Sequence, residues 1–127
     1  MNSPGERFRV FVYGTLRREG SNHFRMEGSS FLGEATVRGR LYKIDWYPGL
    51  VLDPAGDWIP GEVFEVGPEQ LAALDEFEGV SAAEVEGSEY RRVETIAQLE
   101  SGPMTVGVWE WIGPVKEADR IRDWLEK

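Results

Sequence analysis

The segment 8–13 alternates in side-chain orientation, and its residues are mainly β-branched or aromatic. A period of two predicts a β-strand, and because Arg9 is its only charged residue, both faces are expected to be buried. Gly14 ends the strand, since glycine permits a sharp backbone turn. The N–H groups of Thr15 and Leu16 follow where the chain leaves the sheet. Successive N–H groups at a turn can bind an anion, so this is either an ordinary turn or the floor of a carboxylate or phosphate site.

Further strands are predicted where β-branched and aromatic residues gather between glycines, prolines and aspartates. In chain order they cover 30–44, as one or two strands interrupted at Gly33 and Gly39, and then 50–52, 58–66, 89–100 and 103–112. Proline and glycine predict turns at 46–49 and 53–57. The chain is therefore expected to be rich in strands.

A helix is predicted to begin at Pro68, because proline is favoured at the first helical position, and to stop at Gly79. Leu71, Leu74 and Glu78 are spaced i, i+3 and i+7, which puts them on one narrow face of that helix. Since the two leucines must face the core, Glu78 is carried to the core edge at the end of the helix.

Two weaker helical patterns lie on either side of these elements. Residues 21–28 predict a short helix whose Phe24 and Met26 pack inward. Residues 117–127 predict a closing helix with one apolar stripe. The stripe is made of Ala118, Ile121, Trp124 and Leu125.

The remaining segments predict little regular structure. Residues 1–6 are expected to be a loose tail, and the acidic segment 81–88 is either a lid or a solvated loop. The chain, 1–127, contains no repeat or linker, so it is expected to form a single domain. The fold class predicted from these patterns is α+β, strand-rich with two modest helices.

Composition narrows the chemistry. The 127 residues contain no cysteine, which excludes disulfides, thiol nucleophiles and thiolate metal sites. The single histidine, His23, cannot supply a histidine-based metal cluster, and no spacing of acidic residues suggests a metal site. The net charge of −9, with scattered basic residues, opposes binding to nucleic acid or anionic lipid. Because no apolar signal region or membrane span is evident either, we expect a cytoplasmic protein that binds a small molecule.

Glu78 is the carboxylate whose place on a helix predicts an apolar setting. Burial makes a carboxylate expensive to ionise, so its pKa rises and it can exchange protons near neutral pH. The alternative is that Glu78 reaches water or pairs with Arg91 or Arg92. By the same helical spacing, Asp75 is expected nearer the inward side and Glu76 in solvent.

Tyr90 and Arg92 lie two residues apart on a predicted strand and would share one face. They are either an aromatic and a charge on a half-exposed sheet, or a phenol and a guanidinium that line the same pocket. The pattern by itself leaves both interpretations open.

Four motifs together resemble the γ-glutamylcyclotransferase-like superfamily, with its AIG2-like and γ-glutamylamine cyclotransferase branches and small bacterial relatives. They are Val-Tyr-Gly-Thr-Leu-Arg at 12–17, Tyr-Pro-Gly at 47–49, Leu-Asp-Glu-Phe-Glu-Gly-Val at 74–80 and Glu-Tyr-Arg-Arg at 89–92. The resemblance covers nearly the whole chain. It implies a small mixed β-barrel flanked by a few short helices, with a cavity at the end of the first strand.

The resemblance also implies a reaction and the residues for it. A small γ-glutamyl compound would be converted to 5-oxoproline and a free amine, with no metal, nucleotide or other cofactor. Glu78 matches the family's catalytic acid/base. Residues that match the substrate-binding part of the site are Tyr13, Gly14, Thr15 and Leu16, whose backbone would hold the α-carboxylate, and Tyr90, with Arg92 in a less defined role and Asn22 and Pro48 at the entrance.

Other functions fit the same fold. A non-catalytic module could use the cavity to bind an amino-acid-like ligand, and a hydrolase or aminoacyl-transfer enzyme could use the same scaffold. The leaving group of a cyclotransferase could be an amino acid, a lysine side chain or another amine. The sequence does not distinguish these, nor does it give an oligomeric state.

Overall fold

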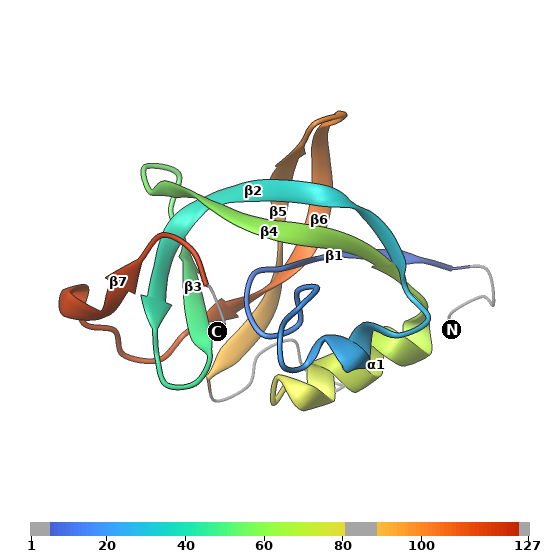
Figure 1. Cartoon of the computed structure of the whole chain (residues 1–127), viewed down its shortest axis with the longest axis horizontal. Helices are drawn as coiled ribbons and strands as arrows, with labels where there is room; N and C mark the ends of the chain where they lie inside the picture. The colour runs from blue at the N-terminus through green and yellow to red at the C-terminus, as the bar shows by residue number, and fades with distance from the viewer. Residues whose placement is uncertain (1–5, 81–88, 125–127) are drawn as a thin grey trace.

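The computed structural model describes residues 6–80 and 89–124 and places them in one β-sheet with a single α-helix (Figure 1). The strands are β1 (Phe8–Val12), β2 (Ser30–Lys43), β3 (Pro48–Leu52), β4 (Asp57–Val66), β5 (Tyr90–Leu99), β6 (Gly102–Trp111) and β7 (Arg120–Ile121). The helices are α1 (Pro68–Phe77) and two 3₁₀ turns, η1 (His23–Met26) and η2 (Glu117–Asp119).

Five of the strands close into a barrel. Their order is β2–β4–β1–β6–β5, and β5 returns to pair with β2 through Ala35 opposite Leu99. The β1–β6 pair is parallel, whereas the other pairs are antiparallel, so the barrel is mixed. β3 and β7 pair with β2 outside the closed ring. The small mixed barrel implied by the family resemblance is confirmed.

β1 lies at the centre of the sheet, with β4 on one side and β6 on the other. Its alternation divides the core into two parts, because successive side chains point to opposite faces. Phe11, which is fully buried, belongs to the cluster inside the barrel. Val10 belongs to a second cluster with Leu71 and Leu74 of α1. Burial of both faces of this strand, as expected from the sequence, therefore follows from the barrel on one side and α1 on the other.

The helix α1 lies along the outside of the barrel beside the loop that follows β1 (Figure 1). Pro68 occupies its first turn, as predicted. Gln70 ties the helix to η1, since its side-chain amide donates to the carbonyl oxygens of Arg25 at 3.2 Å and Glu27 at 3.1 Å. This docking holds the start of α1 beside η1.

β2 is a single strand rather than two. It runs through Gly33 and Gly39, with one irregularity in its pairing with β4 between Phe31 and Gly33. The predicted turn at 46–49 is also shorter, because Pro48 already pairs with Lys43 in β3. Gly39 pairs with Leu52 of β3 and Asp57 of β4, and Gly33 pairs with Val63 of β4, so the two glycines do not end the strand.

The predicted closing helix is wrong for the residues that the structure describes. After the short η2 turn the chain forms β7, in which Ile121 pairs with Leu41 of β2. Arg120 holds this segment with ion pairs to Asp57 at 3.3 Å and Glu117 at 3.1 Å. An available strand edge has overridden a weak helical stripe, because pairing satisfies backbone groups that a short exposed helix would leave to water.

The predicted helix at 21–28 is a single 3₁₀ turn, η1, with one inward side chain. Met26 is buried, whereas Phe24 is 64% exposed, so the inward placement of Phe24 was wrong. Side chains two residues apart do not share a face of a helix. The Phe24 ring instead lies under the Arg25 guanidinium, 4.9 Å from the ring centroid. The tail at 1–6, except for Glu6, and the loop at 81–88 lie outside the described residues.

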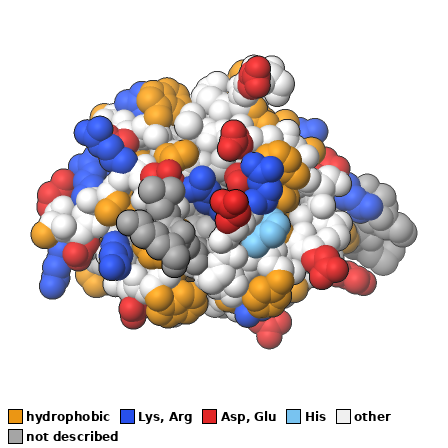
Figure 2. Space-filling view, viewed as in Figure 1, with side chains coloured by type: hydrophobic (Ala, Val, Ile, Leu, Met, Phe, Trp, Pro, Cys, Tyr) orange, Lys and Arg blue, Asp and Glu red, His pale blue; other side chains and the backbone are white. Residues whose placement is uncertain are grey.

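Acidic and basic side chains are interspersed on the face shown in Figure 2, without a stripe of one sign. No helix within residues 6–80 and 89–124 is long and apolar enough to cross a membrane.

Candidate functional site

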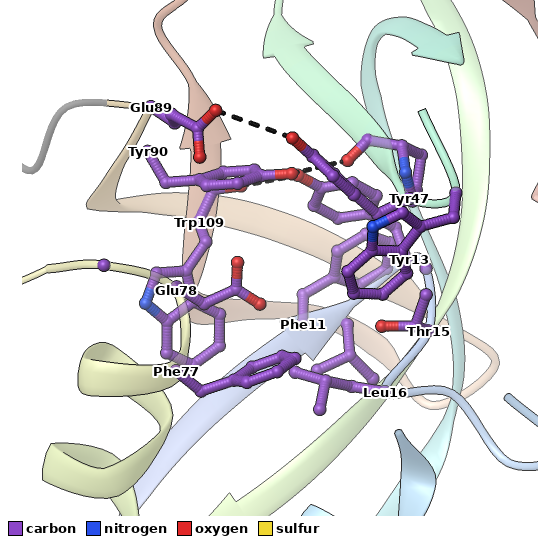
Figure 3. Close-up of a pocket in the computed structure, with 15 residues that line it drawn as sticks. Phe11, Tyr13, Thr15, Leu16, Tyr47, Phe77, Glu78, Glu89, Tyr90 and Trp109 are labelled. Carbon is purple, nitrogen blue, oxygen red and sulfur yellow. Dashed lines mark hydrogen bonds between the residues drawn. The ribbon is translucent and has the colours of Figure 1, made fainter. Parts of the chain in front are cut away.

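A cavity of about 380 Å³ opens where β1 ends. The turn after β1, the start of β3, the end of α1 and the start of β5 surround it (Figure 3). Its lining residues are Phe11, Val12, Tyr13, Gly14, Thr15, Leu16, Trp46, Tyr47, Pro48, Phe77, Glu78, Gly79, Glu89, Tyr90 and Trp109. Six of the seven site residues predicted from the sequence are in this set, and Arg92 is not.

Hydrogen bonds hold the turn after β1 through its carbonyl groups. The N–H of Arg17 donates to Gly14 at 3.1 Å, and the N–H of Asn22 donates to Thr15 at 2.9 Å. The Asn22 side-chain amide also donates to the Thr15 hydroxyl, at 3.2 Å. The N–H groups of Thr15 and Leu16 have no acceptor within the described parts of the chain. Both residues are buried and line the cavity, and successive N–H groups at a turn can in general bind an anion.

Glycine is required at position 14 because Pro48, at the start of β3, lies very close to it, and not because of the backbone angle φ. The φ of Gly14 is outside the left-handed range, so the turn after β1 needs glycine for space and not for an unusual backbone angle. A Cβ added at Gly14 would lie 2.6 Å from Cγ and 2.8 Å from Cδ of Pro48. Only a residue without a side chain lets β3 approach the end of β1 this closely.

Replacing Gly14 with alanine is therefore expected to cost about 1–3 kcal/mol of unfolding free energy, the usual range for overpacking. The rigid ring of Pro48 has to move, and its carbonyl oxygen accepts a 2.7 Å hydrogen bond from the Tyr90 hydroxyl. Gly107→Ala is the matched control, because its added Cβ would meet no atom closer than 3.8 Å. Urea unfolding of the two variants tests this, and equal stabilities would contradict it.

The end of α1 sets the position of Glu78. The N–H of Val80 donates to Asp75 at 2.7 Å, and the N–H of Gly79 donates to Glu76 at 3.0 Å. With Gly79 at φ 78°, this is a Schellman motif, a common way for a helix to end at glycine. Val80 is fully buried, which anchors the chain just beyond the motif. Glu78 is thereby fixed at the C-cap position, directly after the last residue of α1, with its carboxylate pointing into the cavity (Figure 3).

The Glu78 carboxylate is partly buried among aromatic side chains and carries no ion pair or hydrogen bond within the described residues. The pairing with Arg91 or Arg92, considered as an alternative, is not found. Burial, and secondarily the negative charge of Asp75, raise the pKa of Glu78 to about 7. Near neutral pH this group is present in both its protonated and its ionised form.

Two tyrosine hydroxyls of the wall are engaged with backbone. Tyr13 donates to the Trp109 carbonyl oxygen at 2.7 Å and accepts from the N–H of Leu50 at 3.2 Å. Tyr90 donates to Pro48. Burial raises the pKa of both tyrosines above the usual value, so they stay neutral. They join β1, β3, β5 and β6 around the cavity and leave their rings to form its apolar wall.

Arg92 is drawn away from the cavity by Asp75, a residue that the sequence analysis noted only as inward-facing. The Arg92 guanidinium donates from Nε at 2.8 Å and from Nη2 at 3.1 Å to the two carboxylate oxygens. The indole N–H of Trp109 donates to the same carboxylate at 2.9 Å. Asp75 therefore fastens α1 to β5 and β6, and Trp109 lines the cavity on the other side. The sequence indicated this role only through the helical spacing, which placed the acidic side chain of Asp75 on the inward side of the helix.

Three further residues at the cavity mouth were not predicted as site residues. Trp46 and Tyr47 precede β3, and Glu89 precedes β5. The Tyr47 hydroxyl lies 3.5 Å from the Glu89 carboxylate (Figure 3). Tyr47 and Glu89 were quoted within motifs, but only the fold shows that these two loops meet.

No group of three or more histidine, cysteine, aspartate or glutamate side chains that could hold a metal occurs in residues 6–80 and 89–124. Among the described residues, the cavity therefore combines the Glu78 carboxyl group, which has no hydrogen bond or ion pair, with the turn that carries the N–H groups of Thr15 and Leu16.

Comparison with known proteins gives a consistent result. A family model described as "Gamma-glutamyl cyclotransferase, AIG2-like" matches residues 10–126. The gamma-glutamylcyclotransferase family protein YtfP of Escherichia coli is 32% identical over 122 residues, which are 94% of this chain and 97% of that protein. The gamma-glutamylaminecyclotransferase of Rattus norvegicus is 32% identical over 124 residues, covering 89% of this chain and 72% of the rat protein.

Other relatives differ in length or are known by their structure. The chain spans 48% of a longer Arabidopsis thaliana relative, to which it is 37% identical over 90 residues. The crystal structure of an AIG2-like protein from Mus musculus superposes with a TM-score of 0.72 at 23% identity, covering 90% of this chain and 82% of the mouse chain. At that identity the likeness shows a shared fold.

Proposed function

We propose that this chain, which belongs to the gamma-glutamyl cyclotransferase, AIG2-like family, converts a small γ-glutamyl compound to 5-oxoproline and a free amine. The observation that carries the proposal is the unpaired Glu78 carboxylate, with its pKa near 7, in one cavity with the turn at 14–16. The reaction needs a base and an acid in succession, and one carboxyl group with a raised pKa can act as both.

The turn after β1 would hold the substrate. The N–H groups of Thr15 and Leu16 suit a carboxylate oxygen, because donors at a turn concentrate positive potential without a charged side chain. Binding the α-carboxylate there would leave the γ-carbonyl free to reach Glu78. A γ-glutamyl chain held at one end and folded toward the other brings its own amine to its own carbonyl. Holding the two groups together can supply a large part of the rate enhancement.

Glu78 would move two protons in succession. In its ionised form it takes a proton from the substrate's α-ammonium group, and the freed amine nitrogen attacks the γ-carbonyl carbon. Glu78 returns this proton to the leaving nitrogen as the amide C–N bond breaks, and it then takes the second proton from the ring nitrogen and passes it to the departing amine. One C–N bond forms and one breaks, no water is consumed, and the products are 5-oxoproline and the amine in its ammonium form.

This mechanism predicts how activity depends on pH. Because the free enzyme must hold Glu78 ionised, kcat/KM is expected to fall by about tenfold per pH unit below pH 7, as the carboxylate becomes protonated. Initial rates measured from about pH 5 to pH 8 give this limb. A fall in kcat/KM that begins only near pH 4.5, the ordinary pKa of a glutamate carboxyl group, would contradict the role assigned to Glu78.

A panel of γ-glutamyl dipeptides and γ-glutamylamines, assayed by mass spectrometry for 5-oxoproline and glutamate, tests the function itself. Release of 5-oxoproline supports the cyclotransferase. Release of glutamate would support a hydrolase. Tight binding with no product from any compound would support the binding module that uses the same cavity. We further propose that the reaction is metal-independent, so dialysis against a chelator should leave the rate unchanged.

A further inference from the structure

The turn after β1 is fixed through its carbonyl groups, and this also sets the direction of its N–H groups. The Gly14 carbonyl oxygen accepts from the N–H of Arg17 at 3.1 Å, and the Thr15 carbonyl oxygen accepts from the N–H of Asn22 at 2.9 Å. These peptide bonds are trans, and in a planar trans peptide the N–H points opposite to the carbonyl oxygen. The bonds to Gly14 and Thr15 therefore direct the next N–H groups, those of Thr15 and Leu16.

The chain beyond the turn folds back on it through an unfavourable backbone conformation. Gly20 lies so close that an added Cβ would overlap the Thr15 carbonyl oxygen. Just before it, Glu19 has a φ of 72°, the only positive value among the non-glycine residues that the structure describes. A residue with a side chain adopts this conformation at a cost, and it persists only where its surroundings impose it. The return of the chain toward Thr15 thus depends on contacts that flank Glu19.

Glu62 of β4 makes the contact on the N-terminal flank. It lies opposite Val12, the last residue of β1, which puts it level with the start of the turn. One of its carboxylate oxygens accepts from the main-chain N–H of Arg18 at 2.7 Å, and the other accepts from the Arg18 Nε at 3.1 Å. The barrel wall thereby holds the main chain directly beyond the turn.

The Glu62 side chain is only 5% exposed, whereas that of Arg18 is 46% exposed. The Arg18 guanidinium also lies 4.0 Å from the centroid of the Phe31 ring and 3.8 Å from the Glu34 carboxylate. Replacing a buried ion pair by apolar residues of similar size is often neutral or stabilising, because burying the charges is costly. Stability alone therefore does not account for a carboxylate at position 62.

We propose that Glu62 is a positioning residue for the reaction. By holding the main chain at Arg18, it keeps the N–H groups of the turn at 14–16 aimed at the α-carboxylate of the substrate. Glu62 does not line the cavity, so it acts through the turn and not on the substrate. The inference rests on the proposed cyclotransferase function and adds a residue of β4 to its site.

Glu62→Met tests this role, because methionine is similar in size but is a poor acceptor for the Arg18 N–H. We expect KM for a γ-glutamyl substrate to rise by about tenfold or more, with kcat within about threefold of wild type. The turn would bind the α-carboxylate equally in the ground state and the transition state, and loss of such binding raises KM alone. The dissociation constant of 5-oxoproline, which retains the α-carboxylate, should rise with KM, and an NMR titration measures it.

Glu62→Gln separates position from charge. Glutamine keeps an oxygen that can accept from the Arg18 N–H, so KM should return to within about threefold of wild type. If the negative charge of Glu62 mattered instead, its removal would favour an anionic substrate and lower KM.

Glu110→Met is the matched control for loss of stability. The Glu110 side chain is 8% exposed, and it accepts from a main-chain N–H, that of Leu52 at 2.8 Å, and from the Nε of Arg91 at 3.0 Å. It has the same two kinds of donor as Glu62 but does not hold the turn or line the cavity. Glu110→Met should therefore lower Tm about as much as Glu62→Met and leave KM unchanged.

Arg18→Met changes the half-exposed end of the same ion pair and serves if Glu62→Met does not fold. It removes the side-chain bond and leaves the main-chain bond to Glu62, so KM should rise by about threefold. A wild-type KM in this variant, an equal change of KM in Glu62→Met and Glu110→Met, or a lowered KM in Glu62→Gln would overturn the inference and leave the cyclotransferase standing. No 5-oxoproline from the wild-type protein with any compound of the panel would overturn the proposed function, and with it the inference.

Discussion

Glu78→Gln is expected to lower kcat for 5-oxoproline release by on the order of 10²–10⁴-fold, the range that general acid–base groups contribute. Glutamine keeps the size and polarity of the side chain but cannot take up and return a proton. Since the Glu78 carboxylate has no partner among the described residues, the substitution breaks no contact that holds the cavity. The loss should therefore lie in kcat, with a smaller change in KM. Initial rates by mass spectrometry measure both.

Glu76→Gln is the matched control for this loss. Glu76 lies two residues away on α1, is exposed, and does not line the cavity, so its variant should keep the wild-type rate. A Glu78→Gln enzyme with wild-type kcat would show that another group carries the proton.

The same substitution should make the protein more stable at high pH. Glu78 has a folded-state pKa of about 7, above its usual value of 4.5, so the folded chain binds this proton more tightly than the unfolded chain. Stability therefore falls as pH rises between these two values, and above pH 7 the buried charge costs up to about 3 kcal/mol. Glutamine has no such cost. Glu78→Gln should thus raise Tm at about pH 8 and have little effect at about pH 4, and thermal unfolding at both values checks this.

Asp75→Ala is expected to destabilise the fold by about 3–5 kcal/mol, the cost of leaving a buried charge without its partner. The Asp75 side chain is almost fully buried and accepts three hydrogen bonds, two from Arg92 and one from Trp109. Alanine leaves a partly buried guanidinium and an indole N–H without their carboxylate partner, and it frees the end of α1 from β5 and β6. Urea unfolding at neutral pH measures the loss.

Two further variants separate the network from general damage to α1. Glu76→Ala, at the adjacent exposed position, should cost less than about 0.5 kcal/mol. Arg92→Met combined with Asp75→Ala should be less destabilising than the sum of the single changes, because the stranded charge is removed. Additive effects, or equal losses at residues 75 and 76, would contradict the network.

The sequence was informative where a local pattern and the fold agree. Alternation at 8–13 predicted a strand buried on both faces, and the barrel and α1 provide those two faces. Proline and glycine predicted the two ends of α1 at Pro68 and Gly79, and the i, i+3, i+7 spacing carried Glu78 to the core edge. Each of these follows from the geometry of a single element.

What the sequence did not predict depends on partners far along the chain. Barrel closure between β2 and β5 rests on a pairing that no local pattern marks, and it was expected only from the family resemblance. β7 replaced a helix because a free edge of β2 was available to Ile121. Arg92 shares a strand with Tyr90, yet Asp75 on α1 holds it outside the cavity. The meeting of Trp46, Tyr47 and Glu89 likewise needed two loops to be placed together.

The account depends on a single carboxyl group that titrates near neutral pH in the cavity at the end of β1. Carbon-13 NMR of the Glu78 carboxyl carbon across the pH range, with assignment from the Glu78→Gln variant, measures that pKa directly. The expected result is a titration centred near pH 7. A titration centred near 4.5, the value of an ordinary solvated carboxyl group, would contradict the account.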